Sequence, residues 1–219
     1  MEIADRPDAI DVPPTLADLF ARLADRLQGR VAVVSGRSLA DLDHHLPAQG
    51  IAKSGSHGVE LRTDSGTRDV VPDPALANAR AALRQFATGA RGVLVEDKPA
   101  GVALHYRLAP QCEEEARDLV ARLARATGLA VQHGHMVAEL RPAGFDKGQA
   151  VRALMAQAPF AGARPVFVGD DLTDEHAFEA VRAMGGAGVL VRESRATAAE
   201  YFLPSVAAVR EFLELYANA

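Results

Sequence analysis

Apolar residues recur along the chain with two spacings, and their alternation predicts a mixed α/β protein. From Thr15 to about Gln28 they follow the 3.6-residue period of an amphipathic helix, and Gly29 can end that helix. Residues 31–34 are then all apolar, which is typical of a strand buried in a parallel sheet. The first 14 residues contain three prolines and no strand pattern, so we expect a loop there.

The same order of helix and strand continues to about residue 60 and returns near residue 146. Ser38 can cap a short helix that ends near His45, and Asp146 can cap a second helix. The other expected elements are a strand over 51–54, a helix over 147–157, a strand over 165–168, a helix over 174–184 capped by Thr173, a last strand over 188–191 and a closing helix over 205–216.

Between these two parts the pattern changes to helix-strand-strand, repeated twice. The expected elements are helices over 75–87 and 113–127 and strands over 92–96, 102–107, 129–133 and 136–140. This order predicts an antiparallel sheet with helices on one face, and Gly134 suits a tight hairpin. Because residues 63–74 are polar and rich in turn formers, we place a domain crossing there. The predicted domains are a core of residues 1–70 and 144–219 and an insertion of residues 71–143.

Composition limits the partners and the compartment. A chain of 219 residues with 48% hydrophobic content can bury a full core. The net charge of −5 gives no general attraction for nucleic acid or anionic membranes, so we expect neither as a partner. The single cysteine, Cys112, excludes an internal disulfide and fits a reducing compartment. With no signal-like or membrane-spanning run, the sequence predicts a cytoplasmic protein.

Three aspartates follow the apolar strand near residue 168. Asp170, Asp171 and Asp174 stand where open parallel sheets bind ligands, at the carboxyl end of a strand. Neighbouring carboxylates repel one another, and Mg²⁺, which prefers oxygen ligands, relieves that repulsion. The segment therefore predicts a magnesium site. The alternative interpretation is a solvated acidic loop that only caps the next helix.

Two further residues suit the binding of a phosphate group. Ser35 follows an apolar strand and precedes Gly36 and Arg37, so its hydroxyl and the nearby amides can meet an oxyanion. Lys147 stands in the first turn of a predicted helix, where its charge adds to the helix dipole. The alternatives are an ordinary serine-glycine turn and a solvated lysine.

The order of these segments resembles motifs two, three and four of the haloacid dehalogenase (HAD) superfamily of phosphatases. Within it, the segments Val33–Arg37, Gly55–Glu60 and Gly169–Glu175 together resemble the trehalose-6-phosphate phosphatases, over nearly the whole chain. The resemblance implies Mg²⁺-dependent hydrolysis of trehalose 6-phosphate to trehalose and phosphate. It also implies a Rossmann-type core with a parallel sheet and a mobile, inserted α/β cap domain.

The resemblance also implies roles for individual residues. Ser35 and Lys147 would hold the transferring phosphoryl group with Arg37 beside them, and Asp170 would ligate Mg²⁺ with support from Asp171 or Asp174. Candidate sugar-binding residues near the core site are His57 and Glu60, although His57 could instead stabilise a tight turn. The candidate sugar-binding residues in the cap are Lys98, His105, Arg107, Glu139 and Arg141. For the cap group the alternative is a charged, solvent-facing side of an antiparallel sheet.

The superfamily's first motif, an apolar strand that ends in Asp-x-Asp, has no counterpart in the sequence. Asp5 and Asp8 follow no apolar strand and have Pro7 between them. We therefore expect a core sheet without its first strand and catalysis only in a form that includes the missing segment. The alternatives are a non-catalytic sugar-phosphate binder, a phosphatase for another sugar phosphate and an unstable remnant of the fold.

Overall fold

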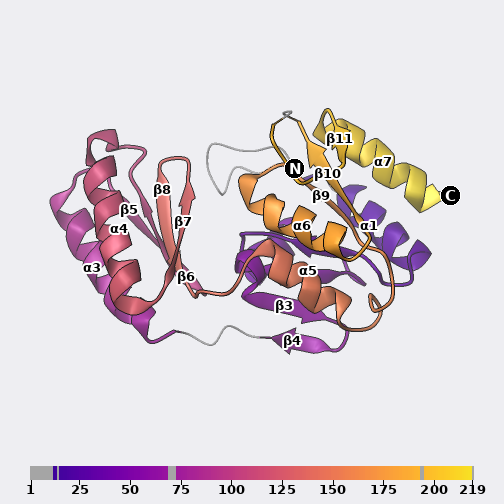
Figure 1. Ribbon diagram of the computed structural model, residues 1–219, viewed down its shortest axis with the longest axis horizontal. Helices are drawn as coiled ribbons and strands as arrows, with labels where there is room; N and C mark the ends of the chain where they lie inside the picture. Colours follow the sequence, from indigo (N-terminus) through magenta and orange to yellow (C-terminus); the bar gives the residue numbers. More distant parts are fainter. Residues whose placement is uncertain (1–11, 14, 69–72, 193–194, 219) are drawn as a thin grey trace. The chain divides into compact units, whose positions relative to one another are not determined.

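A computed structural model describes residues 12–13, 15–68, 73–192 and 195–218 (Figure 1). Contacts divide the chain into two compact units. One, the core unit, comprises the residues up to Arg68 together with those from Asp146 onward, and the other, the inserted unit, comprises the residues between them. Most of the loop expected over the first 14 residues lies outside the described residues.

The first sheet of the core unit is mixed, whereas the sequence predicted a parallel one. Its strands, in sheet order, are β1 (Ala32–Val34), β2 (Ala52–Gly55), β3 (Glu60–Thr63) and β4 (Gly66–Arg68). Strand β1 pairs with β2 in parallel, but β2–β3 and β3–β4 are antiparallel. The short connections before and after β3 leave no room for a crossover, so these strands must run in opposite directions. The sequence predicted no strand over residues 60–63, and β4 lies within residues 63–74, where we expected only turns.

The second sheet of the core unit is parallel throughout. Its order is β11 (Tyr201–Leu203), β10 (Ala187–Val191) and β9 (Val166–Gly169). The expectation that residues 188–191 form the last strand was wrong, because β11 follows. With only three residues, β11 is too short to show a periodic pattern, and its pairing with β10 defines it.

Five helices complete the described core unit: α1 (Thr15–Arg26), α2 (Leu39–His45), α5 (Lys147–Met155), α6 (Glu175–Ala183) and α7 (Val206–Asn218). Helices α5 and α6 pack side by side (Figure 1). Leu154 of α5 belongs to a cluster with residues of the first sheet, and Val151 belongs to another with Phe167 of β9. Helix α5 therefore packs against both sheets.

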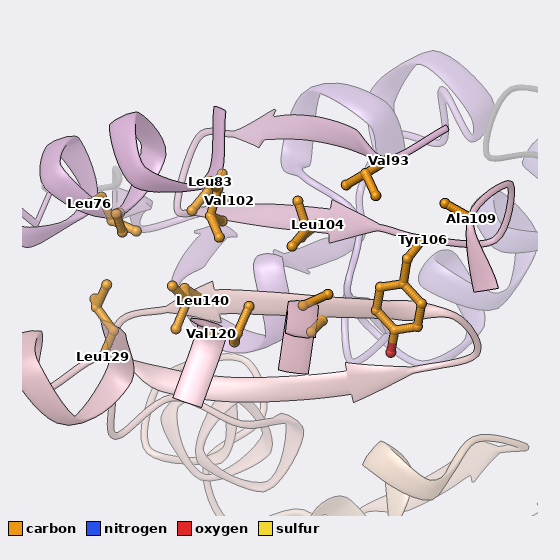
Figure 2. Packing of buried hydrophobic residues seen from close by; sticks show 13 residues of the cluster. Leu76, Leu83, Val93, Val102, Leu104, Tyr106, Ala109, Val120, Leu129 and Leu140 are labelled. Carbon is orange, nitrogen blue, oxygen red and sulfur yellow. The ribbon is translucent and has the colours of Figure 1, made fainter. Parts of the chain in front are cut away.

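The inserted unit confirms the predicted order of helix-strand-strand repeated twice. It contains α3 (Ala75–Gly89), β5 (Leu94–Lys98), β6 (Gly101–His105), α4 (Glu113–Thr127), β7 (Ala130–Gly134) and β8 (Val137–Arg141). The sheet order is β5-β6-β8-β7, and every pair is antiparallel. Both helices contact the sheet, and thirteen buried residues form one continuous core between them (Figure 2).

One turn of the inserted unit differs from expectation. Gly134 ends β7 and pairs with Val137, so the hairpin loop consists of His135 and Met136. Met136 has a positive φ of 58°, whereas Gly134 does not have a positive φ. In the described part of the chain, no helix has the length and apolar character needed to cross a membrane.

Candidate functional site

The loop after β1 is held by a backbone hydrogen bond to strand β2 and by a bond within the loop. The Ser35 amide donates to Ser54 O (2.9 Å), and the Ser35 Oγ accepts from the amide of Arg37 (3.1 Å). Ser38 caps α2 as predicted, because its hydroxyl accepts from the amide of Asp41 (3.1 Å). The loop between β1 and α2 is therefore short and fixed at both ends.

The turn from Gly55 to Gly58 braces this loop. Ser56 and His57 have φ angles of 49° and 55°, a left-handed conformation that side chains other than glycine disfavour. The Ser56 amide donates to Arg37 O (2.7 Å), and the His57 amide donates to Ser35 O (2.9 Å). A Cβ on Gly36 would lie 2.5 Å from His57 Nε2, so the imidazole lies against the Ser35 loop where only glycine fits.

Glu60, at the start of β3, is buried at 8% exposure. Its Oε2 accepts from the Ser56 hydroxyl (2.6 Å) and from the Leu39 amide (3.2 Å). A buried carboxylate needs such donors, because losing water without replacing its hydrogen bonds is costly. The sequence predicted that Glu60 binds sugar, and the structure shows one of its oxygens engaged inside the protein.

Lys147 and Asp174 form a buried ion pair. Asp146 caps α5 as predicted by accepting from Gln149 N (2.7 Å), which places Lys147 in the first turn. The Lys147 Nζ lies 2.6 Å from Asp174 Oδ1, and both residues are largely excluded from solvent. Because each charge neutralises the other, the pair can persist where either charge alone would be strongly unfavourable.

The other oxygen of Asp174 organises the aspartate loop. Its Oδ2 accepts from the amides of Asp170 (2.9 Å) and Asp171 (2.8 Å). A Cβ on Gly169 would lie 2.5 Å from Asp174 Cγ, which explains the glycine at that position. Both Asp174 oxygens are therefore engaged, and these contacts favour a role in holding Lys147 and the loop over direct metal ligation.

Asp171, not Thr173, is the N-cap, so that expectation was wrong. The Asp171 carboxylate accepts from Thr173 N (2.8 Å) and heads a 3₁₀ turn, Leu172–Asp174, that leads into α6. Together with Asp174 it forms a capping box, which Thr173 cannot form because the residue three positions after it is His176 rather than an acidic residue. The Asp170 side chain is exposed, and the described residues give its carboxylate no hydrogen bond.

The Glu175 carboxylate, at the start of α6, makes a further set of contacts beside the aspartate loop, and the sequence did not predict them. The Glu175 carboxylate pairs with Arg195 and accepts from Thr197 Oγ1 and from Ala198 N (2.7 Å). Arg195 Nη2 also donates to Asp171 O (2.9 Å). Burial alone would raise the pKa of Glu175, but the hydrogen bonds and the Arg195 charge outweigh it and lower the pKa below 4.5. An acidic residue in a first helical turn is common, so nothing local marked this partner loop.

The start of α5 contacts both the turn beside Ser35 and the aspartate loop. A Cβ on Gly58 would lie 2.8 Å from Asp146 O, so the turn beside Ser35 touches the N-cap of α5. The next residue, Lys147, contacts Asp174. Ser35 and Asp170 therefore lie on loops that neighbour the start of α5, where Lys147 lies. Among the described residues, no group of three or more His, Cys, Asp or Glu is arranged to hold a metal.

In the inserted unit, four of the five predicted sugar-binding residues belong to the sheet. Lys98 Nζ lies 2.5 Å from Glu139 Oε2, and His105 Nε2 lies 2.7 Å from Glu96 Oε2. Arg141 donates to Phe145 O and to Gln132 Oε1.

The strand register places most of these polar side chains on one face. Glu96 pairs with Ala103, Ala103 with Glu139, and Glu139 with Gln132. The register therefore gathers a charged face opposite the apolar face that α3 and α4 cover. Arg107 is exposed and lies beyond the end of β6 at His105, so strand alternation does not place it beside His105.

The sequence and the fold both match known proteins. The family described as "Trehalose-phosphatase" matches residues 1–207. A probable trehalose-phosphate phosphatase of Sinorhizobium fredii is 39% identical over 194 residues, which is 87% of this chain and 73% of that protein. A trehalose-6-phosphate phosphatase of Escherichia coli is 36% identical over 221 residues, which is 100% of this chain and 83% of that protein.

Solved structures with lower identity share the fold. The crystal structure of a trehalose-6-phosphate phosphatase related protein superimposes with a TM-score of 0.81 at 24% identity, over 99% of this chain and 92% of that one. The C-terminal domain of a trehalose-6-phosphate phosphatase of C. albicans gives a TM-score of 0.80 at 20% identity, over 100% of this chain and 88% of that one. Together with the matches in sequence, they account for the fold of the entire described chain.

Proposed function

Because this chain belongs to the trehalose-phosphatase family, we propose that it hydrolyses trehalose 6-phosphate to trehalose and inorganic phosphate. The observation that carries the proposal is the convergence of two loops and the start of α5 in a chain of this family. They present Ser35, Asp170 and Lys147 at one end of the core unit.

Ser35 and Lys147 are proposed to bind the phosphoryl group, with Arg37 beside them. The Ser35 hydroxyl accepts from Arg37 N and keeps its own proton to donate to a phosphate oxygen. The Lys147 ammonium has three donors, and the Asp174 contact uses one of them. Asp174 thus fixes the position of the Lys147 ammonium, and the remaining N–H donors of that group can bind an anion at the start of α5. The helix dipole also favours negative charge there.

Asp170 is proposed to hold Mg²⁺. This ion is usually bound by one or two protein carboxylates and completes its shell with water and substrate phosphate. The exposed Asp170 carboxylate fits that arrangement, whereas Asp171 and Asp174 already cap the helix and hold the loop. When bound, Mg²⁺ would supply positive charge to polarise the phosphoryl oxygens.

We also infer that one further parallel strand, outside the described residues, completes the core sheet. Among the described residues, β1 pairs only with β2, and β9 pairs only with β10, so each has one edge without a strand partner. Helix α5 packs against both sheets, which is the position of a helix covering one continuous sheet. The family resemblance places the nucleophilic aspartate of the Asp-x-Asp motif at the end of such a strand.

The charged face of the inserted unit is proposed to bind the sugar. Lys98 and Glu139 offer a donor and an acceptor side by side, and His105 lies on the same strand face. Ala103 in the middle of that face leaves room for a ligand. Sugar hydroxyls both donate and accept, so paired charges of opposite sign suit them.

The test is phosphate release from trehalose 6-phosphate with Mg²⁺, measured beside glucose 6-phosphate, on protein that carries the completing strand. We expect clear preference for the disaccharide, and Lys98→Ala should reduce that preference with little loss on glucose 6-phosphate. Equal release from both substrates would contradict the assignment to trehalose 6-phosphate.

A further inference from the structure

Glu60 is a buried carboxylate within a strained part of the core unit. Its Oε2 gathers two donors that are far apart in sequence, the Ser56 hydroxyl at 2.6 Å and the Leu39 amide at 3.2 Å. The Leu39 amide belongs to the first turn of α2, where amides have no partner within the helix. One oxygen therefore links the turn after β2 to the start of α2.

The turn that Glu60 holds is costly in isolation. Ser56 and His57 are two consecutive residues other than glycine with positive φ, and such backbone persists only where the surroundings impose it. The amides of this turn donate to the carbonyls of Ser35 and Arg37. If the turn relaxed to ordinary angles, the loop that carries Ser35 would lose both of these bonds.

The space around the turn is filled by backbone on two sides. A Cβ on Gly55 would lie 2.7 Å from Leu39 N and 2.9 Å from Glu60 Oε2. On the other side, a Cβ on Gly58 would lie 2.8 Å from Asp146 O, the N-cap carbonyl of α5. The turn therefore lies between the Ser35 loop and the helix that begins with Lys147.

We propose that Glu60 is a positioning residue that locks the left-handed Ser56–His57 turn and thereby sets the Ser35 loop against the start of α5. It acts through Ser56 and Leu39. The functional part of this inference rests on the proposed phosphate-binding role of Ser35 and Lys147, whereas the locking itself does not.

The experiment compares Glu60→Ala, Glu60→Gln and a matched control, Asp43→Asn, by amide hydrogen exchange with and without inorganic phosphate. Asp43 is a carboxylate in the same part of the core unit, but the hydrogen bonds and ion pairs of its carboxylate go to Lys53 and Arg62 and not to the turn. Glutamine keeps an oxygen that can accept from Ser56 and Leu39, so it should rescue the loop.

In Glu60→Ala we expect residues 35–39 and 56–57 to exchange about tenfold faster than in the parent, because two hydrogen bonds are lost. Exchange in β10 should change much less. Asp43→Asn should leave residues 35–39 and 56–57 near the parent rates relative to β10, and Glu60→Gln should lie close to the parent.

Several results would overturn the proposal. One is unchanged exchange of the loop in Glu60→Ala, and another is the same uniform increase across the core unit in Glu60→Ala and Asp43→Asn.

If phosphate protects the loop equally in the parent and in Glu60→Ala, the positioning role is wrong and the phosphate site stands. If phosphate protects neither while Glu60→Ala still loosens the loop, the positioning stands and the phosphate role of Ser35 fails.

Discussion

The two units of this protein bury their apolar residues in different ways. The inserted unit has one four-stranded sheet, two covering helices and a single cluster of thirteen buried residues (Figure 2). In the described core unit, the strands form two separate sheets, and three separate clusters of buried apolar residues contain four, four and three members. The smaller unit therefore has the more continuous core.

Some elements of the core unit are more exposed than the central strands of the inserted unit, although Phe178 and Val181 of the core unit are completely buried. No residue of β1 is fully buried, and Val166 of β9 is 57% exposed, although parallel strands are normally covered on both faces. Helix α7 likewise has no buried residue. By contrast, Val102, Leu104 and Leu140 of the inserted unit are completely buried. The described core unit therefore combines separate apolar clusters with buried polar contacts such as Lys147–Asp174, whereas the inserted unit has one continuous apolar core.

The largest effect should come from breaking the buried ion pair of the core unit. Asp174→Ala leaves the Lys147 charge without its partner and frees the amides of Asp170 and Asp171, so we expect a loss of about 3–5 kcal/mol in stability. Hydrogen exchange resolved by residue should show the loss in β9 and β10 and leave β6 and β8 protected.

The control for this change is Asp170→Ala, which removes a neighbouring carboxylate that receives no hydrogen bond from the described residues. Its effect should stay within about 0.5 kcal/mol, as for other surface substitutions. A similar loss in both variants would contradict the structural role assigned to the Asp174 carboxylate.

A cavity in the inserted unit should act on that unit alone. Leu104→Ala removes a completely buried side chain from the continuous cluster, with an expected loss of about 2–5 kcal/mol. Exchange should rise in β5, β6 and β8, with β9 and β10 unchanged. An equal rise of the exchange rates in both units would show that they unfold together. It would contradict separate cores in the two units.

Among the contacts expected to stabilise the fold, the smallest effect should come from the Glu175–Arg195 pair, and it should depend on pH. The pKa of Glu175 is lower in the folded protein than the ordinary 4.5, so its ionised form contributes stability above that pH. That contribution is lost as the pH falls through the lowered folded value. Glu175→Gln should cost about 1–3 kcal/mol near neutral pH and less in acid.

Urea denaturation between pH 3 and pH 7 checks this expectation. The difference between the parent and Glu175→Gln should shrink toward pH 3. A difference that stays constant over this range would contradict the ionised clamp with Arg195.

Much of the fold could be predicted because local signals decide it. Ser38 and Asp146 are strong caps, and the bounds of α1 and α4 follow the helical period closely. Strands β3, β4 and β11 were missed, since three or four residues carry little periodicity and it is pairing with a neighbouring strand that defines them.

Part of the candidate site could be predicted, because local signals mark the ends of strands and the starts of helices. Position after a strand marked Ser35 and Asp170, and position at a helix start marked Lys147. What each carboxylate binds could not be predicted, because the partners are distant in sequence. Asp174 meets Lys147 across 27 positions, and Glu60 meets Leu39 across 21.

The most direct test of the central claim is the steady-state release of phosphate from trehalose 6-phosphate, with Mg²⁺, by the parent and by Asp170→Asn in protein that carries the completing strand. We expect turnover by the parent and a fall of about a hundredfold or more in the variant, because a charge that faces the reacting phosphate is lost. Near-equal rates in the two proteins, or no release by the parent, would contradict the account.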